Sequence, residues 1–596
     1  MSMAHLPNWQ LDTIFPSLDS SEYKQAKSSL EKQLKTLEAF FDKYDIRTGK
    51  GKKVSPKDTH SLDQILDKSN QLYSDMSDLR TFLYLITSTQ AFNDKARAEF
   101  SEIQPLSVRL SILSTRFTAW LERFEAKKLI TSKKALAHRH ALENAIRHSK
   151  HLMGEEAEEV ASSLIPSSTR AWAKLHDDLI SRTTLNYNGK ALTLTQLKNL
   201  QSNANPNVRK AAFKSELKIL EQNEVSFAAA LNSIKGNVNE LCKRRGWDSA
   251  LEQALEQNNL SQKSLEAMQQ ACREAFPMLR RYLKAKAKFL GKRKLGWYDL
   301  DAPVSKAKTA SYSWEASKSF ILEHFSNYSE SLAAFAKHSF DGHWHDVPPY
   351  KGKTNGAYCA EIPGRKESRI MHNFSGTLDD LFTLAHELGH AYHSECMYHH
   401  KRTFIQMNTP MTLAETASIF CETIVVNAVL EKAKPQEKLA ILEQDLRGAT
   451  ALVIDIYSRF LFEKGVFEKR LERELSIDEF KQLMLSAQEQ TYGDALGQGH
   501  ELMWAHKGHY YIAGMDFYNY PYTFGYLFAL GLYAEYQRQP VGFHQRYDRL
   551  LSSSGLADAK TLASDFGIDI ESVDFWRRSL SIIEARVREF ENLAKS

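Results

Sequence analysis

Apolar residues recur at intervals of three and four along most of this chain, which is the spacing of one face of an α-helix. The pattern is strongest over residues 21–45, 60–95, 97–127, 133–149, 153–181, 206–245, 260–292 and 434–473. Long helices require few helix breakers, and the chain has only 26 Gly and 15 Pro among 596 residues. We therefore expect a mainly α fold, too large for one compact core and divided into two or more lobes.

Strand signals are few, and two of them stand out. Residues 184–187 and 190–194 flank Asn188-Gly189, which is a strong signal for a two-residue β-hairpin turn. Residues 357–362 and 368–372 are separated by a Pro-Gly pair that should turn the chain. The second pair predicts a small sheet just before the segment that carries the chemistry.

A polar, proline-containing stretch at residues 203–206 separates the first hairpin from the next long helix. We place a domain boundary there. Residues 1–204 then form a helical N-terminal region, and residues 205–596 form a second domain.

Composition excludes several classes of protein. The net charge is only +5, because Lys and Arg are balanced by acids, so nothing favours a nucleic-acid binder. We find no apolar run approaching the roughly 20 residues that span a bilayer. The first residues lack the basic start and apolar stretch of a signal peptide. Five scattered cysteines suit reduced thiols. We expect a cytoplasmic protein without membrane partners; the oligomeric state stays open.

The segment 377–390 contains the motif His386-Glu387-Leu388-Gly389-His390. Thr377 can cap a helix that is apolar over much of its surface, so we expect that helix to be buried. His386 and His390 then project from one face and can hold one tetrahedral zinc ion. Glu387 lies roughly 100° around the helix, where it can act as general base on a zinc-bound water. The alternative, a structural pair of histidines, is disfavoured because unpaired polar groups are costly to bury.

A catalytic zinc needs a third protein ligand. Glu415 is the candidate, 25 positions after His390 and predicted on a second apolar helix. It could instead close a helix N-terminus in a capping box with Thr412, and we favour the ligand. Glu422 follows on the same helix face. It can accept a hydrogen bond from the non-ligating nitrogen of a zinc histidine, or it can be a plain surface glutamate.

These motifs resemble those of a known family. The segments are HELGHAYH, LAETASIFCE after it, NGAYCAEIPGRKESRIMHNFSGTLDD before it, and DFYNYPYTFGYLFALG near the C-terminus. They are similar to oligoendopeptidase F, of the thimet-oligopeptidase-like zinc peptidases, densely over residues 205–585 and more loosely before them. The resemblance implies a two-lobed helical shell around a deep substrate channel, with one zinc ion on its floor. It also implies a cytoplasmic endopeptidase that acts on short unstructured peptides.

The resemblance assigns roles outside the zinc motif as well. His509 matches the substrate-contacting histidine of the family, and the transition-state tyrosines fall within residues 518–526. The candidates are Tyr518, Tyr520, Tyr522 and Tyr526, of which Tyr526 and Tyr518 are preferred. Phenol or imidazole donors beside the developing oxyanion lower the barrier to hydrolysis. Aromatic packing is the alternative for any one tyrosine.

Gly356, Ala357 and Tyr358 resemble the strand edge that lies beside the active site in this family. A bound peptide could add to that edge through main-chain hydrogen bonds, which would accommodate many substrate sequences. An ordinary small sheet without a substrate role is the alternative.

The predicted reaction is metal-assisted hydrolysis of internal peptide bonds. Glu387 takes a proton from the attacking water and later delivers it to the leaving amine. Two rival hypotheses remain. One is an exopeptidase of the peptidyl carboxypeptidase type, which needs a fixed group for the terminal charge of the peptide. The other is a non-catalytic helical peptide-binding protein, against which the intact Glu387 argues. Cleavage preference and substrate length are not predicted.

Overall fold

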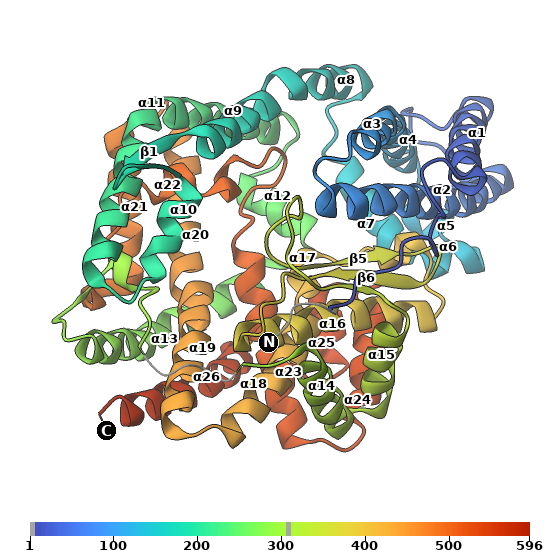
Figure 1. Cartoon of the computed structure of the whole chain (residues 1–596). Helices are drawn as coiled ribbons and strands as arrows, with labels where there is room; N and C mark the ends of the chain where they lie inside the picture. Colours follow the sequence, from blue (N-terminus) through green and yellow to red (C-terminus); the bar gives the residue numbers. More distant parts are fainter. Residues whose placement is uncertain (1–5, 305–310, 596) are drawn as a thin grey trace. The chain divides into compact units, whose positions relative to one another are not determined.

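The computed structural model describes residues 6–304 and 311–595, and over those residues the protein is mainly helical with three small sheets (Figure 1). This confirms the predicted mainly α fold. The chain forms two compact units. Unit 1 contains residues 1–155, 310–428 and 536–562, and unit 2 contains residues 156–309, 429–535 and 563–596. All five cysteines are free, as expected.

The elements of unit 1 come from three stretches of sequence. They are α1 (Ser21–Lys43), α2 (Pro56–Thr89), α3 (Asp94–Glu102), α4 (Gln104–Leu121), α5 (Ala126–Leu129), α6 (Lys133–Ala137), α7 (Arg139–Ser149), α14 (Trp314–Tyr328), α15 (Glu330–Asp341), β4 (His345–Asp346), β5 (Tyr358–Ile362), β6 (Glu367–Met371), α16 (Leu378–His399), η4 (Phe404–Met407), α17 (Met411–Ala414) and α24 (Phe543–Ser553). Helices α18 (Thr416–Lys432), α23 (Tyr520–Arg538) and α25 (Ala559–Ser564) contain residues of both units.

Unit 2 contains the longest helix of the chain. Its elements are α8 (Glu155–Leu164), η1 (Ile165–Ser167), α9 (Thr169–Arg182), β1 (Thr184–Tyr187), β2 (Lys190–Thr193), α10 (Leu194–Asn199), η2 (Leu200–Ser202), α11 (Pro206–Arg244), α12 (Ala250–Gln257), α13 (Gln262–Phe289), β3 (Leu295–Gly296), η3 (Trp297–Asp299), α19 (Pro435–Thr450), η5 (Ala451–Asp455), α20 (Ile456–Arg470), α21 (Ile477–Tyr492), η6 (Gly493–Ala495), β7 (Leu496–Gln498), α22 (Met503–His506), η7 (Gly508–Tyr511) and α26 (Val573–Leu593).

Proline accounts for two helices that are shorter than predicted. The expected helix over residues 97–127 breaks where α4 begins with Pro105 in its first turn. The expected helix over residues 153–181 breaks at η1, which contains Pro166. Proline has no N–H to donate and clashes with the preceding turn, so a new helix starts there. A five-residue π-helical segment, η5, interrupts the helix expected over residues 434–473.

The small sheet of unit 1 lies beside α16 (Figure 1). Its strand order is β4-β6-β5, and β5 pairs antiparallel with β6 from Tyr358↔Met371 to Ile362↔Glu367. The turn between β5 and β6 falls at the predicted Pro363-Gly364. In the described sheets β5 has one strand neighbour only, so it is an edge strand.

The N-terminus of α16 is stabilised locally. Thr377 accepts a hydrogen bond from the backbone N–H of Asp380, and Asp380 accepts from the backbone N–H of Thr377, which is a capping box. Most of the apolar side chains of α16 are buried. The helix therefore has a fixed start and a fixed rotation about its axis. Together these fix the direction in which the side chains of residues 386–390 project.

Unit 2 contains the first predicted hairpin. Strands β1 and β2 pair antiparallel around Asn188 and Gly189, whose φ angles are +52° and +82°. Positive φ at both positions is what a two-residue turn of this kind requires, and Asn-Gly meets that requirement. The core of this unit packs side chains of α11 against the segment 502–511, including Trp504, Tyr510 and Tyr511.

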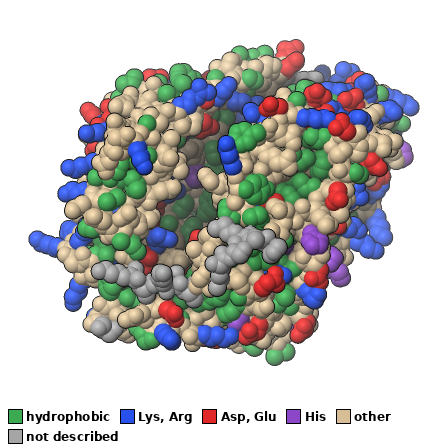
Figure 2. Space-filling model, viewed as in Figure 1, with side chains coloured by type: hydrophobic (Ala, Val, Ile, Leu, Met, Phe, Trp, Pro, Cys, Tyr) green, Lys and Arg blue, Asp and Glu red, His purple; other side chains and the backbone are tan. Residues whose placement is uncertain are grey.

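One described stretch corrects the expectation about apolar runs. Residues Met411–Lys432 form a helical stretch that is long and apolar enough to cross a membrane, with a mean hydropathy of 1.5 over its most apolar window. However, 72% of that window is buried inside the protein, which is the property of a core helix. On the face drawn in Figure 2, basic and acidic side chains both occur across the surface.

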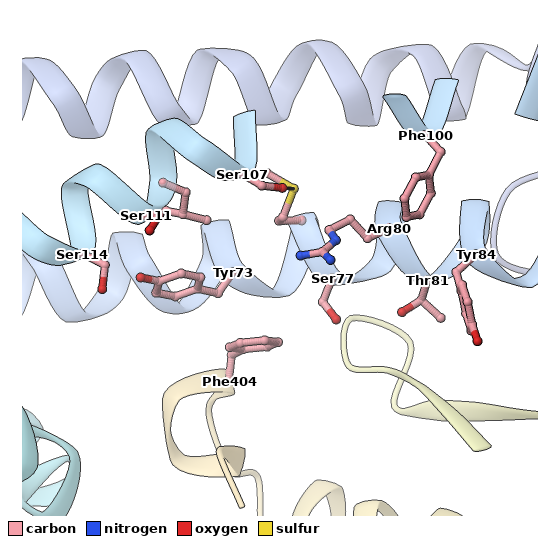
Figure 3. A pocket seen from close by; sticks show the side chains of 12 residues that line it. Tyr73, Ser77, Arg80, Thr81, Tyr84, Phe100, Ser107, Ser111, Ser114 and Phe404 are labelled. Carbon is pink, nitrogen blue, oxygen red and sulfur yellow. Dashed lines mark hydrogen bonds between the residues drawn. The ribbon is translucent and has the colours of Figure 1, made fainter. Parts of the chain in front are cut away.

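A pocket of about 580 Å³ opens among α2, α3, α4 and η4 of unit 1 (Figure 3). Tyr73 and Phe404 stack at one end with ring centroids 5.8 Å apart. Its lining contains aromatic, aliphatic and hydroxyl side chains and Arg80, but no His, Cys, Asp or Glu. It therefore lacks both metal ligands and a general base.

The predicted boundary at residue 204 stays a prediction. The two compact units divide the chain at other positions, because each unit is assembled from three separated stretches.

Candidate active site

Two segments of unit 1 bring the three predicted metal ligands together. Nε2 of His386 lies 3.3 Å from Oε2 of Glu415, and Nε2 of His390 lies 3.5 Å from the same oxygen. The two imidazole rings are 4.9 Å apart at 79°. Each of the three side chains is about a quarter exposed (26%, 27% and 22%), so the cluster is accessible from outside.

The spacing of these atoms fits a zinc ion. Zinc bound tetrahedrally at about 2.0–2.2 Å separates its ligand atoms by about 3.3–3.5 Å. The spacings of 3.3 Å and 3.5 Å from Glu415 fall in that range. Two imidazoles and one carboxylate are also a donor set of catalytic zinc sites, which leave the fourth position to water or substrate.

A close approach between helices explains why Glu415 meets the two histidines. A Cβ atom added to Gly389 would lie 2.5 Å from the carbonyl oxygen of Ala417 and 2.6 Å from Cα of Ser418. Only glycine allows α16 and the start of α18 to pack at this distance. The glycine inside the motif therefore allows Glu415 to lie close to the two histidines.

Glu415 differs in one respect from its prediction. It does not lie within a helix but at the break between α17 and α18, where it ends α17 with φ −88° and ψ 5°. Its carboxylate accepts a hydrogen bond from the hydroxyl of Ser418 at 2.7 Å. Burial acts to raise the pKa of Glu415, but the hydrogen bond with His386 and the charges of both histidines hold that pKa at about 2. The group is therefore an anion.

Glu422 lies on α18, where its carboxylate reaches the other face of the first histidine. Nδ1 of His386 is 3.1 Å from Oε2 of Glu422. Burial acts to lower the pKa of His386, but hydrogen bonds with Glu415 and Glu422 raise it well above its ordinary value. The pKa of His390 is lowered to about 4 by burial and by the charge of His386. The carboxylates thus create an environment that favours a cation.

Glu387 projects from α16 toward the edge strand. It is only 7% exposed, and burial raises its pKa to about 7, although the nearby charge of His386 acts in the opposite direction. The backbone N–H of Cys359 on β5 hydrogen bonds to its carboxylate. A carboxylate with a pKa near neutrality is suited to accept and return a proton.

The edge strand begins at the predicted peptide-binding residues. Gly356 has φ +82°, Ala357 follows, and Tyr358 is the first residue of β5. The hydroxyl of Tyr358 lies 2.5 Å from that of Ser88 on α2. On α16, Ser394 donates a hydrogen bond to Glu361 of β5 at 2.7 Å, so the strand is fixed to the helix that carries the histidines.

In unit 2, the structure brings three of the remaining predicted residues together. The ring of His509 stacks on that of Tyr518 at 5.4 Å, and Tyr522 lies 6.3 Å from His509 and 5.6 Å from Tyr518. Nδ1 of His509 is buried without a hydrogen-bond partner. Burial, together with the charges of Arg459 and Lys507, lowers the pKa of His509 to about 4, so the imidazole is neutral at pH 7.

The other two tyrosine candidates are more deeply buried. Tyr520 is 2% exposed, and its hydroxyl donates to the carbonyl oxygen of Ala254 at 3.2 Å. Tyr526 is 8% exposed and lies one helical turn beyond Tyr522 on α23. The ring cluster of His509, Tyr518 and Tyr522 is therefore the more accessible group of donors.

A second His–Glu cluster in unit 2 was not predicted. Glu216, His500 and His506 place ligand atoms within 4.8 Å of one another. Nζ of Lys198 lies 3.0 Å from Nε2 of His506, and Gln201 donates to Glu216. A lysine ammonium beside a ligand ring repels a dication. We therefore interpret this cluster as a buried hydrogen-bond network that fixes the segment 500–506 to α11.

The sequence patterns did not predict two residues that shape the candidate metal site. Ser418 holds the carboxylate of Glu415, and Gly389 permits the close approach of the helices. The signal for Gly389 was present, because a glycine inside a well-formed helix is destabilising and usually has a packing reason. No local pattern marks Ser418.

Comparison with known families agrees with this geometry. The model of Peptidase family M3 matches residues 199–582. An oligoendopeptidase F homolog of Lactococcus lactis subsp. lactis is 25% identical over 531 residues, which cover 86% of this chain and 87% of the relative. Oligopeptidase PepF of Bacillus subtilis is 25% identical over 605 residues, which cover 98% of this chain and 87% of the relative.

Solved structures share the fold. A Chlamydophila abortus protein described as a peptidase superposes with a TM-score of 0.81 and 19% identity, covering 98% of each chain. Oligoendopeptidase-F from Enterococcus faecium gives a TM-score of 0.68 and 20% identity, covering 98% of this chain and 100% of that one. At these identities the likeness establishes the fold alone.

The family match spans well over half of the chain and contains the three predicted ligands, Glu387, His509 and the tyrosine segment. The chain therefore belongs to peptidase family M3, and it is a metallo-oligopeptidase.

Proposed function

We propose that this protein is a zinc-dependent endopeptidase that hydrolyses internal peptide bonds of short, unstructured peptides. The observation that carries the proposal is the cluster of His386, His390 and Glu415, whose ligand atoms have the spacing of a tetrahedral zinc site. The names of the relatives, oligoendopeptidase F and oligopeptidase, support peptides as the substrate class.

His386, His390 and Glu415 would hold one zinc ion per chain. Zinc in such a site acts as a Lewis acid and lowers the pKa of a water molecule to about 7. Glu422 orients the ring of His386 by accepting from Nδ1, so that Nε2 faces the metal position.

Glu387 is the general base in this proposal. Its carboxylate accepts a proton from the attacking water and then donates that proton to the leaving amine. Burial keeps the pKa of Glu387 near neutrality, so both transfers are close to balanced at physiological pH.

His509 and the tyrosines act on the substrate oxygen. We assign His509 and Tyr526 to stabilising the developing oxyanion, and Tyr518 and Tyr522 to contacting the substrate. The neutral imidazole of His509 can donate an N–H without carrying a charge of its own.

The β5 edge provides a way to bind peptides of many sequences. Residues 356–358 lead into an edge strand whose backbone also contacts Glu387 through Cys359. A peptide that adds to this edge is held by main-chain hydrogen bonds, and its carbonyls are aligned without selection for side chains. We also propose a cytoplasmic location and no nucleic-acid or membrane partner.

A blocked peptide tests this function. An internally quenched peptide of about ten residues, acetylated and amidated, is incubated with the zinc-loaded enzyme, and the products are identified by mass spectrometry. Internal cleavage that stops with a chelator and returns with zinc supports the proposal. Cleavage only of peptides with a free terminus would instead assign an exopeptidase, and no cleavage would leave peptide binding without catalysis.

A further inference from the structure

Phe517 has an unusual backbone conformation, and it directly precedes Tyr518 of the ring cluster. Its φ angle is +53°, in the left-handed region that residues other than glycine rarely adopt, because their Cβ crowds the following carbonyl oxygen. Such a conformation persists only when its surroundings hold it, and it is found most often at functional sites. The contacts that hold Phe517 therefore influence the direction of the next side chain, Tyr518.

Helix α20 contacts both the backbone and the ring of Phe517. The backbone N–H of Phe517 donates to Oε1 of Glu463 at 3.2 Å, in a buried position. The ring of Phe517 is buried, and its centroid lies 5.5 Å from that of Phe460 and 5.3 Å from that of Phe467. Hydrogen bonds to carboxylates are stronger than those between neutral groups. These contacts attach Phe517 firmly to α20.

Lys235 joins the same carboxylate to the residue before Phe517. Lys235 lies on α11 with a fully buried side chain, and its Nζ donates to Oε1 of Glu463 at 2.7 Å. The same Nζ donates to Oδ1 of Asp516 at 2.8 Å and lies 4.8 Å from the centre of the Phe467 ring. Two consecutive residues of the loop are thus bound to the pair of Lys235 and Glu463. We call Lys235, Glu463 and Asp516 the ion triad.

The alternative is that the ion triad only stabilises the packing of α11 against α20. Two observations favour a role in the ring cluster. The ion pair of Lys235 and Glu463 joins those two helices without any contribution from Asp516. The contacts of the loop also fall on the two residues immediately before Tyr518, whereas residues 514 and 515 are exposed. The loop is therefore anchored at the point where it determines the direction of the tyrosine.

Tyr518 follows the two anchored residues, and its ring lies in the ring cluster. It stacks on the ring of His509 with centroids 5.4 Å apart and planes 23° apart, and Tyr522 meets it edge-on at 5.6 Å and 84°. We propose that the residues of the ion triad are positioning residues, which hold Tyr518 against His509 through the backbone of Phe517. This inference rests on the proposed function, in which both rings act on the substrate.

Placement of these rings matters because a donor acts on the substrate only at hydrogen-bond distance. His509 and Tyr518 are both only partly buried, so their mutual contact alone restricts them little. The ion triad adds a restriction from the backbone side. Donors that are held in place before the reaction lower the barrier most, and a small displacement of such groups lowers the rate. Loss of the triad should therefore reduce activity without removing a metal ligand.

The test removes the member of the ion triad that belongs to the loop. Asp516→Ala breaks the contact with Lys235 but leaves Lys235 paired with Glu463, so no buried ammonium is left alone. Asp516→Asn keeps an oxygen acceptor for Lys235. The matched control is Glu443→Ala, which removes a carboxylate of the same 9% side-chain exposure from a second buried lysine of unit 2. That lysine, Lys286, keeps a backbone carbonyl oxygen as acceptor.

Kinetics on a blocked, internally quenched peptide measure the effect. We expect Asp516→Ala to lower kcat/KM by about tenfold, Asp516→Asn by about threefold at most, and Glu443→Ala by less than about twofold. In the background of Tyr518→Ala, adding Asp516→Ala should cause no further loss, because both changes then act through the same ring. Equal losses in Asp516→Ala and Glu443→Ala would overturn the proposal, and so would a full tenfold loss in the Tyr518→Ala background.

A measurement without substrate separates this inference from the proposed function. Fluorotyrosine is incorporated at position 518 alone, and its fluorine NMR resonance reports on the ring stacked against it. His509→Ala should shift this resonance because the stacked ring is lost. Asp516→Ala should shift it too, and Glu443→Ala should not. A resonance that Asp516→Ala leaves unmoved would overturn the positioning role whatever the enzyme cuts. A resonance that moves, in a protein that cuts no blocked peptide, would support the positioning role and refute the proposed function.

Discussion

Nδ1 of His386 lies 3.1 Å from Oε2 of Glu422, while Nε2 of the same ring lies 3.3 Å from Oε2 of Glu415. The ring is thus held between two carboxylates on different sides. One carboxylate faces the metal position and the other fixes the rotation of the ring. This arrangement is the one that keeps a metal-ligating histidine in a single tautomer.

Removing the outer carboxylate should weaken metal binding without removing a ligand. We expect Glu422→Ala to lower zinc affinity by about 10- to 100-fold, with activity restored by excess zinc. Zinc titration against a competing chelator measures this. Glu431→Ala, an exposed glutamate on the same helix, serves as the control. Wild-type zinc affinity in Glu422→Ala would show that the carboxylate is an ordinary surface group.

The glycine of the motif should be sensitive to a single methyl group. In Gly389→Ala the new Cβ collides with Ala417 and Ser418, so α16 and α18 must separate. We expect a loss of about 1–3 kcal/mol in stability, together with lower zinc content as Glu415 moves away. Gly448→Ala is the matched control, because its Cβ meets nothing within 4 Å. Thermal melting and metal analysis that fail to distinguish the two variants would refute the close-packing argument.

The pKa of Glu387 predicts an acid limb in the rate. The carboxylate is raised to a pKa of about 7, so below that pH it is increasingly protonated and cannot accept a proton. We expect kcat/KM to fall tenfold per pH unit on the acid side, with a midpoint at or below pH 7, because a bound cation lowers the pKa further. Rates measured from pH 5 to 9 on an uncharged peptide test this. A flat profile down to pH 5 would argue against Glu387 as the base.

The imidazole of His509 should matter for the transition state more than for binding. We expect His509→Ala to lower kcat by about 10²-fold with little change in KM, as loss of one oxyanion donor does. Tyr520→Phe provides contrast, since that hydroxyl donates to a backbone carbonyl and should leave kcat nearly unchanged. Steady-state kinetics on one peptide compare the two. An effect confined to KM in His509→Ala would reassign the residue to substrate binding.

How much the sequence could predict depends on the range of the interactions involved. The zinc helix follows from local signals: Thr377 caps it, and four-residue spacing puts His386 and His390 on one face. Helix breaks at Pro105 and Pro166 were also encoded locally, and periodicity alone overlooked them.

Other features depend on contacts that no local pattern contains. Glu415 ends a short helix because α17 and α18 meet at a break against Gly389. The lowered pKa of His509 likewise arises only in the packed fold, because burial and the charges of Arg459 and Lys507 together cause it.

Exchanging one oxygen of the Glu387 carboxylate for an amide nitrogen tests most directly whether this residue is the base. Wild type and Glu387→Gln are compared on a quenched peptide of about ten residues blocked at both ends, with the zinc content of both proteins measured. We predict that both proteins bind one zinc ion per chain, that the wild type cuts an internal bond, and that the variant loses nearly all activity. Cleavage by the variant at the wild-type rate, or a wild type that binds no zinc, would contradict it.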